Sequence, residues 1–187
     1  MYYLSQSLTI EDSKIYFTSD SGIEHEVMMD WEDSLMSGSA SFVTQNGGDI
    51  LEIGFGMGIS ANYIQSHSIS SHTVIENHPD IIPLALDWAS EKPNTNVITG
   101  SWYEVLSSLD KYDGIFYDTY GDEDLHHFES SVTSLIRTNG LVCWWNTLDT
   151  SGSIFSFDDV EYQVFEVNAP ANSYYNSNQY FLPKKQF

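Results

Sequence analysis

The residues of this chain best suited to chemistry are alternate glycines and acidic side chains at the ends of short apolar runs. The run Ile50–Gly58 reads ILEIGFGMG, so an apolar segment carrying Glu52 leads directly into the glycines. Glycine lets the backbone turn sharply and approach a ligand that a Cβ atom would keep away. Twenty-two positions after Gly54, the run His72–Ile75 ends at Glu76. Open α/β sheets bind the hydroxyl groups of a ribose with an acidic residue at about this distance.

The glycine pattern also indicates the kind of ligand. Loops that bind a pyrophosphate read GxGxxG, whereas Gly54, Gly56 and Gly58 form GxGxG. The carboxylate of Glu52 beside the loop suits a cofactor that carries positive charge, such as the sulfonium and ammonium groups of S-adenosylmethionine. We therefore predict that S-adenosylmethionine binds here and leaves as S-adenosylhomocysteine. A strand-to-helix turn without a ligand explains the glycines but does not explain Glu76.

Two later runs end in further candidate residues. Gly100, Ser101 and Trp102 follow the third apolar run, and the segment YDTY that contains Asp118 follows the fourth. Ligands of open α/β sheets gather at this edge. Trp102 is interpreted as an aromatic side chain beside adenine or as a core residue, and both interpretations stay open. For Asp118, a catalytic position beside the cofactor's methyl group is favoured over a helix cap, a role that the nearby Asp122 and Asp124 suit as well.

The elements that must position these residues alternate between strands and helices, which favours a mostly parallel sheet covered on both faces. The predicted strands are 50–53, 73–76, 96–98, 114–117 and 141–145, followed by an antiparallel hairpin of 160–167 and 174–182 on the sheet edge. The predicted helices are 59–65, 81–89, 102–109 and 125–136. The fold class is thus α/β, a Rossmann-like, mostly parallel seven-stranded sheet with a C-terminal antiparallel hairpin. The polar run 172–178 is interpreted as the turn of that hairpin, with a loop on the substrate side as the alternative.

The amino-terminal part is predicted to hold a small hairpin, 8–10 with 14–17, and then an amphipathic helix. Met28, Trp31, Leu35 and Met36 recur at three- and four-residue spacing, which is typical of a helix over 27–36. This helix is expected to cover the cofactor as a lid, or to pack on the sheet as an ordinary helix. We treat 1–187 as a single domain, with a substrate and lid segment over 1–45 and a catalytic core over 46–187.

Composition narrows the classes of partner. The chain has 187 residues, with 6 basic and 27 acidic side chains and a formal charge of −21. This charge repels phosphate backbones, so nucleic acid is not expected as a partner. It would attract a cationic substrate, although solubility alone also explains an acidic surface. Cys143 is the single cysteine, and neither a secretion signal nor a membrane span is recognised. We therefore expect a cytoplasmic protein. We also expect a monomer or a weak homodimer.

Three segments together resemble the guanidinoacetate N-methyltransferase family. They are MMDWE at 28–32 followed by Met36, LEIGFGM at 51–57, and DGIFYDTY at 113–120. The resemblance covers the chain from Val27 to Trp145, and the closing hairpin is weakly similar. The related fungal protein-arginine methyltransferases, which modify the internal guanidine nitrogen, share this framework. The resemblance implies a class I methyltransferase fold and S-adenosylmethionine as the methyl donor.

The resemblance also implies roles for individual residues. Glu32 and Asp118 are the catalytic carboxylates that hold the substrate guanidinium, and Glu76 binds the ribose. The substrate site is completed by Tyr120 and by the backbone of Asn146 and Thr147, which binds a substrate carboxylate. The cofactor site comprises Met36, Glu52, Gly54, Phe55, Gly56, Met57, Gly58, Glu76, Asn77, Ser101, Trp102 and Asp118. The chain departs from the family in its shorter amino end, in Gly121 after Tyr120 in place of proline, and in the loop after Trp145, where the usual helix is missing.

Two carboxylates suit this chemistry on physical grounds as well. A guanidinium has a pKa of about 12.5 or more and no lone pair free to attack, so its nitrogen must be oriented and must lose a proton. Paired carboxylates match its planar fork of N–H donors, and one of them, Asp118, accepts the proton as the methyl group is transferred. No metal is expected, because adjacent side chains such as His126 and His127 point in different directions on a helix.

We therefore predict an S-adenosylmethionine-dependent N-methyltransferase that acts on a small cationic guanidino compound, with guanidinoacetate, which gives creatine, as the leading acceptor. One alternative is an arginine side chain within a protein. A second alternative is a binding module that keeps the cofactor fold without turnover.

Overall fold

Seven strands form the central sheet of the structure, a computed structural model that describes residues 2–148, 150–171 and 173–187. They are β4 (Asp49–Ile53), β5 (Ser71–Glu76), β6 (Thr95–Thr99), β7 (Tyr112–Tyr117), β8 (Ile136–Trp144), β9 (Glu161–Glu166) and β10 (Gln179–Gln186). Their spatial order is β6-β5-β4-β7-β8-β10-β9. The strands from β6 to β8 are parallel, and β10 pairs antiparallel with both β8 and β9. The predicted seven-stranded sheet with a closing antiparallel hairpin is confirmed.

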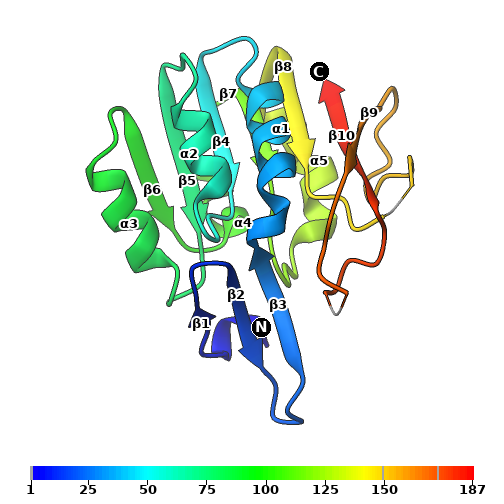
Figure 1. The fold of residues 1–187 in the computed structure, drawn as a ribbon. Helices are drawn as coiled ribbons and strands as arrows, with labels where there is room; N and C mark the ends of the chain where they lie inside the picture. The colour runs from blue at the N-terminus through cyan, green and yellow to red at the C-terminus, as the bar shows by residue number, and fades with distance from the viewer. Residues whose placement is uncertain (1, 149, 172) are drawn as a thin grey trace.

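Helices cover both faces of this sheet, as Figure 1 shows. They are α1 (Asp33–Val43), α2 (Ile59–Gln65), α3 (Ile82–Ser90), α4 (Trp102–Val105) and α5 (Leu125–Leu135). Successive residues of a strand point to opposite faces, so each central strand contributes to two cores. On β7, Phe116 packs in the cluster that includes α1, whereas Ile115 and Tyr117 pack in the cluster that includes α5. Double burial explains why these strands read as continuous apolar runs.

The amino-terminal part differs from the prediction. After η1 (Tyr3–Ser5), a small antiparallel sheet consists of β1 (Thr9–Ile10), β2 (Lys14–Thr18) and β3 (Glu24–Met29). The predicted hairpin of β1 and β2 is confirmed, but the helix predicted from Val27 is wrong at its start. Residues 27–29 belong to β3, a 3₁₀ turn η2 (Asp30–Glu32) follows, and α1 begins at Asp33. Met28 and Met29 are buried because β3 pairs with β2, a long-range contact that the local spacing of apolar residues cannot reveal.

Three other boundaries move. The helix predicted over 102–109 is the four-residue α4 followed by the 3₁₀ turn η3 (Leu106–Ser108). Strand β8 begins at Ile136, directly after α5, rather than at Leu141. Strand β10 begins at Gln179, which pairs with Glu166 at the end of β9, so Tyr174 lies in the loop before the strand. Asn172 lies outside the described residues.

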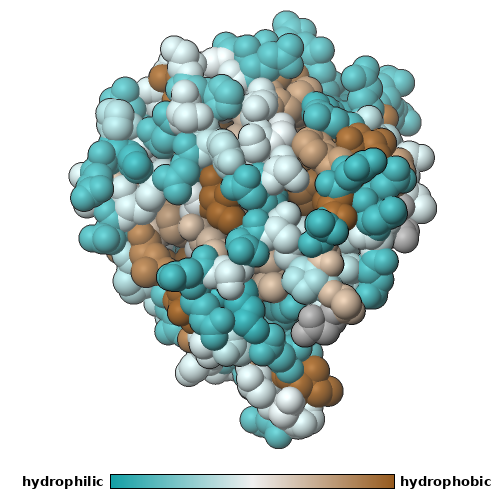
Figure 2. All heavy atoms as spheres, viewed as in Figure 1, coloured by the Kyte–Doolittle hydropathy of each residue, from teal (hydrophilic) through white to brown (hydrophobic). Residues whose placement is uncertain are grey.

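The arrangement places most of the candidate site residues at one end of the sheet. In Figure 1 the small sheet of β1–β3 lies beyond the carboxyl ends of the parallel strands, where the glycine loop and Asp118 are found. Figure 2, in the same view, shows mostly hydrophilic residues over this face, with apolar residues in small groups. None of the described helices is long and apolar enough to cross a membrane.

Candidate active site

Strands β4 and β7 lie side by side, and the loops that leave them touch. The backbone N–H of Asp118 donates to Ile53 O (2.9 Å), and a Cβ added to Gly54 would lie 1.8 Å from Asp118 O. Gly54 also has a φ of 94°, a conformation that side chains disfavour. Glycine at 54 is therefore required by the close approach of the two strand ends, which brings Asp118 to the mouth of the glycine loop.

A pocket, called the cofactor pocket below for the ligand predicted there, opens at these strand ends. Five of its lining residues were predicted for the cofactor from the loop and from β5: Gly54, Phe55, Gly56, Glu76 and Asn77. The others include Trp102 and Asp118, which were also predicted for the cofactor, and Tyr120, which was predicted for the substrate. Tyr3, Val27, Met28 and Ser60 line the pocket as well and were not predicted. The predicted Met57, Gly58 and Ser101 neighbour this lining in sequence without belonging to it.

Glu76 is the polar centre of this pocket. One of its carboxylate oxygens accepts the N–H of Phe55 (2.9 Å), and the other accepts the N–H groups of Asn77 and His78 (2.8 and 2.7 Å). An ionised carboxylate has about four acceptor sites, so a site remains for a ribose hydroxyl. The same contacts fix the glycine loop to the end of β5, so Glu76 shapes the pocket as well as lining it.

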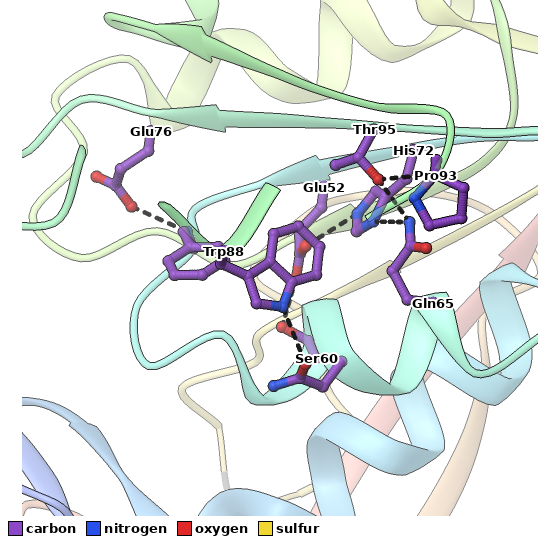
Figure 3. A network of polar contacts seen from close by, with 10 residues as sticks. Glu52, Ser60, Gln65, His72, Glu76, Trp88, Pro93 and Thr95 are labelled. Atoms are coloured by element: carbon purple, nitrogen blue, oxygen red, sulfur yellow. Dashed lines mark hydrogen bonds and ion pairs between the residues drawn. The ribbon is translucent and has the colours of Figure 1, made fainter. Parts of the chain in front are cut away.

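Glu52, predicted to face the positive cofactor, instead faces the interior. It is fully buried, with Ser60 Oγ donating to one oxygen and His72 Nε2 lying 3.0 Å from the other. Gln65 then bridges His72 (3.2 Å) and Thr95 (2.9 Å). Figure 3 shows these polar side chains, which link β4, β5, the end of α2 and β6. Any action of the Glu52 charge on a ligand must therefore operate through space rather than by contact.

The amino-terminal segment reaches the cofactor pocket through strand β3 and turn η1. Met28 Sδ accepts the N–H of Met57 (3.0 Å) and lies over Gly56, while the Tyr3 ring packs near Tyr120 (4.8 Å between centroids). Met36, predicted to line the cofactor, is fully buried in the core beneath α1. Because α1 packs on the sheet, the interpretation as an ordinary helix describes it better than that of a lid.

Trp102 combines the two roles that the sequence left open. Its ring packs edge-on against Tyr117 and Phe128 in the core, and it also lines the cofactor pocket. Its indole N–H donates to Asp122 (2.7 Å), which also accepts from the Tyr117 hydroxyl and from the N–H of Asp124. Asp122 is therefore a structural acid that fixes the loop after β7. The Asp118 carboxylate makes no such contact with any residue that the structure describes.

A second pocket, called the acceptor pocket below for the ligand predicted there, adjoins the first and shares Asp118, Thr119 and Tyr120 with it. Glu32, Trp145, Thr147 and Tyr174 line its inner part, and Glu24, His25 and Glu26 of β3 line its rim. The two acids predicted to hold the acceptor thus come from η2 and the end of β7 into one pocket. Among the described residues, no lysine or arginine lines it; Lys14 lies outside the lining and pairs with Glu24 (2.7 Å).

The electrostatics of this acid pair are unusual. Glu32 is 3% exposed, and burial together with the nearby Asp118 carboxylate raises its pKa well above the ordinary value. Hydrogen bonds from the Tyr174 hydroxyl (3.2 Å) and the Met29 N–H (3.0 Å) oppose that rise. Burial raises the pKa of Asp118 to about 7, with a further contribution from the charge of Glu52. Within the described part of the chain, the Asp118 carboxylate has no hydrogen-bond partner, and no lysine or arginine lines the pocket to balance the charge of the pair.

Asn146 does not reach this pocket. It is fully buried, its N–H donates to the Tyr180 hydroxyl (2.6 Å), and its side chain holds the following loop through Gly152 O and the Ile154 N–H. The predicted use of its backbone for a substrate carboxylate is therefore wrong, because that N–H already has a partner. Thr147 does line the pocket.

The loop between β9 and β10, for which a substrate-side position was only the alternative interpretation, contributes Ser173 and Tyr174 to the lining of this pocket. Ser173 Oγ and the Tyr174 N–H both donate to Glu26 (2.7 and 3.0 Å), so the loop joins β3 across the acceptor pocket. The segment is the turn of the hairpin, as preferred from the sequence. It also lines the acceptor pocket, as the alternative predicted. The aromatic pair at 174–175 was the available signal in the sequence.

Comparisons with known proteins agree with this geometry. The family model for guanidinoacetate N-methyltransferase matches residues 16–169. The chain belongs to this family. It is 33% identical to a Yarrowia lipolytica protein named protein arginine N-methyltransferase 2, over 90% of this chain and 41% of the relative. The Saccharomyces cerevisiae protein of the same name is 30% identical, over 99% of this chain and 52% of the relative. The chain thus spans about half the length of these relatives.

Solved structures show the same fold for this family member. The N-methyltransferase NodS of Bradyrhizobium japonicum matches with a TM-score of 0.62 and 14% identity, over 83% of this chain and 96% of that structure. The precorrin-6y C5,15-methyltransferase of Geobacter metallireducens matches with a TM-score of 0.60 and 16% identity, over 90% and 92% of the two chains. The chain therefore has the Rossmann-like fold of class I methyltransferases, and the cofactor pocket fits S-adenosylmethionine.

Proposed function

We propose that this protein transfers a methyl group to a guanidinium nitrogen of an arginine side chain in a peptide or protein. The observation that carries the proposal is the acceptor pocket, in which Glu32 and Asp118 face a shared space beside the cofactor pocket without a basic residue in its described lining. A planar cation with several N–H donors supplies the positive charge that this pocket lacks and the hydrogen bonds that the Asp118 carboxylate lacks.

The choice of arginine over guanidinoacetate rests on the far end of the acceptor. Guanidinoacetate carries a carboxylate close to its guanidinium, and this anion would enter a pocket lined by Glu24, Glu26, Glu32 and Asp118. The Asn146 N–H, expected to receive that carboxylate, already donates to Tyr180. An arginine within a chain has no carboxylate there. The curated relatives named as arginine methyltransferases support the same choice.

The chain's own residues supply orientation and a proton acceptor. S-adenosylmethionine, when bound, provides a reactive methyl group. Glu32 and Asp118 fix one nitrogen beside the shared wall of the two pockets, so alignment contributes most of the acceleration. With a pKa of about 7 before the acceptor binds, Asp118 is suited to accept the proton released as nitrogen bonds to carbon.

The proposal is tested by incubating the protein with isotopically labelled donor and a panel of acceptors. The panel contains a blocked arginine peptide, free arginine, guanidinoacetate, and a blocked lysine peptide as the control for cationic charge alone. We expect label on the arginine peptide and none on the lysine peptide, with mass spectrometry locating the added methyl group. Absence of transfer to every guanidinium compound would overturn the proposal.

Guanidinoacetate is the second candidate acceptor, because the matching family model carries its name. If the kcat/KM for guanidinoacetate exceeds that for the arginine peptide, guanidinoacetate replaces arginine as the proposed acceptor.

A further inference from the structure

Tyr174 connects the β9–β10 loop to the acid pair of the acceptor pocket. It is 45% exposed as a residue, yet its hydroxyl reaches inward and donates to Glu32 Oε1 (3.2 Å). On the other side, its backbone N–H donates to Glu26 Oε2 (3.0 Å), which also accepts from Ser173 Oγ. The residue is thus held at both its backbone and its hydroxyl, across a gap of 142 positions in sequence from Glu32.

The ring of Tyr174 stands among other aromatic side chains at the pocket. Its centroid lies 5.9 Å from that of Trp31 and 6.3 Å from that of Trp145, and both Tyr174 and Trp145 line the pocket. Burial and the neighbouring Glu32 raise the pKa of the Tyr174 phenol, so the hydroxyl keeps its proton and acts as a donor. An aromatic face beside two acids also suits a flat cation.

We propose that Tyr174 is a positioning residue for the acceptor: its hydroxyl fixes the Glu32 carboxylate so that the second oxygen faces the guanidinium. This proposal deepens the proposed function and rests on it. Glu32 Oε1 receives both the Tyr174 hydroxyl and the Met29 N–H, so the side chain is held from two sides. A carboxylate held in this way binds the acceptor without first losing rotamer freedom.

The hydrogen bond from Tyr174 to Glu32 also affects the titration of Glu32, which a purely structural role of Tyr174 would not do. Because the Tyr174 hydroxyl stabilises the ionised form of Glu32, it lowers the pKa of that carboxyl against the rise caused by burial and Asp118. Removal of the hydroxyl should therefore move the titration of Glu32 to higher pH and weaken acceptor binding at neutral pH.

The test compares Tyr174→Phe with Tyr175→Phe in the full chain. Tyr175 is the matched control, because its hydroxyl donates to Gln179 O (2.6 Å) at the start of β10 and it does not line the acceptor pocket. We expect Tyr174→Phe to lower kcat/KM for the best acceptor about tenfold, as for one lost hydrogen bond to a charged group, with donor affinity unchanged. The acid limb of its pH profile should move to higher pH. Tyr175→Phe should leave that limb in place.

A second readout separates this proposal from the proposed function. Carbon-13 NMR of glutamate carboxyl groups, with Glu32→Gln to assign the Glu32 signal, follows the Glu32 titration in the protein without any acceptor. If no acceptor is methylated, the proposed function fails while this titration still reports on Tyr174. A Glu32 titration that is the same in Tyr174→Phe as in Tyr175→Phe overturns the positioning role.

Discussion

The acidic residues at the two pockets of the sheet's carboxyl edge differ in their hydrogen-bond partners and in their pKa values. On the cofactor side, Glu76 accepts three backbone N–H groups, and Glu52 is paired with Ser60 and His72. On the acceptor side, Glu32 and Asp118 have raised pKa values, and the Asp118 carboxylate has no partner among the described side chains. The cofactor side is preorganised by the protein itself, whereas under the proposed function a cationic acceptor completes the other side. Acidic residues at one sheet edge can therefore stabilise the structure or bind a ligand. Those that have hydrogen-bond partners within the protein serve the first role, and those without such partners are candidates for the second.

The largest effect is expected for Asp118→Asn. The substitution keeps the shape of the side chain but removes its charge and its ability to accept a proton. Turnover should fall by at least about 10³-fold, the range for loss of a general base that also orients the substrate. Calorimetry should show that affinity for S-adenosylhomocysteine changes by less than about threefold, since each neutral contact of the loop is retained. Normal turnover in this variant would remove Asp118 from its proposed role.

The opposite response is expected for Glu76→Ala. This change leaves the N–H groups of Phe55, Asn77 and His78 without their acceptor and removes the predicted ribose contact. Affinity for the cofactor should fall about 100-fold, as for two charge-assisted hydrogen bonds. At saturating donor, kcat for the acceptor should fall much less than in Asp118→Asn. Equal losses in both variants would show that the two pockets do not act separately.

A smaller and inverse effect on stability is expected for Asp118→Asn without ligands. The folded-state pKa of about 7 lies above the ordinary value of 3.8, so the wild type loses stability as the pH rises through this interval. The full shift is discounted because the side chain is partly exposed, so the variant should be more stable at pH 8 by about 1–2 kcal/mol. The gain should shrink as the pH is lowered towards 4, measured by urea unfolding.

Asp122→Asn is the matched control for this stability effect. Asp122 accepts from Trp102, Tyr117 and the N–H of Asp124, so its substitution should destabilise the fold at pH 8. A wild-type or lower stability for Asp118→Asn would contradict the idea that Asp118 is an unpaired acid in the free protein.

Much of the cofactor side could be predicted from sequence because its signals are local. The alternation of apolar runs with helical segments predicted the parallel strands. The glycines together with Glu76 predicted the loop and the strand end beside it. The direction in which Glu52 points was missed, because its partner His72 lies on the neighbouring strand and outside the motif. A residue next to a glycine loop can face either side of a strand end, and sequence spacing does not distinguish them.

The acceptor side could be predicted only in part because it is assembled from distant segments. Glu32 and Asp118 were identified through the resemblance to a family, but the strand that precedes Glu32 was taken for a helix. Met28 and Tyr174 reach the pockets through pairing of β3 with β2 and through contact of the β9–β10 loop with Glu26. Neither contact leaves a local pattern, so only the folded arrangement reveals these residues.

The most direct measurement of the central claim is the number of protons released when a guanidinium binds. Calorimetry at pH 7, in two buffers of different ionisation enthalpy, can follow a blocked arginine peptide binding to the protein saturated with S-adenosylhomocysteine. Because a bound cation favours the ionised forms of Glu32 and Asp118, we expect release of at least about half a proton per peptide bound. The release should fall in Asp118→Asn. Binding with no proton release in the wild type would contradict the account of an acid pair whose raised pKa values fall when the acceptor binds.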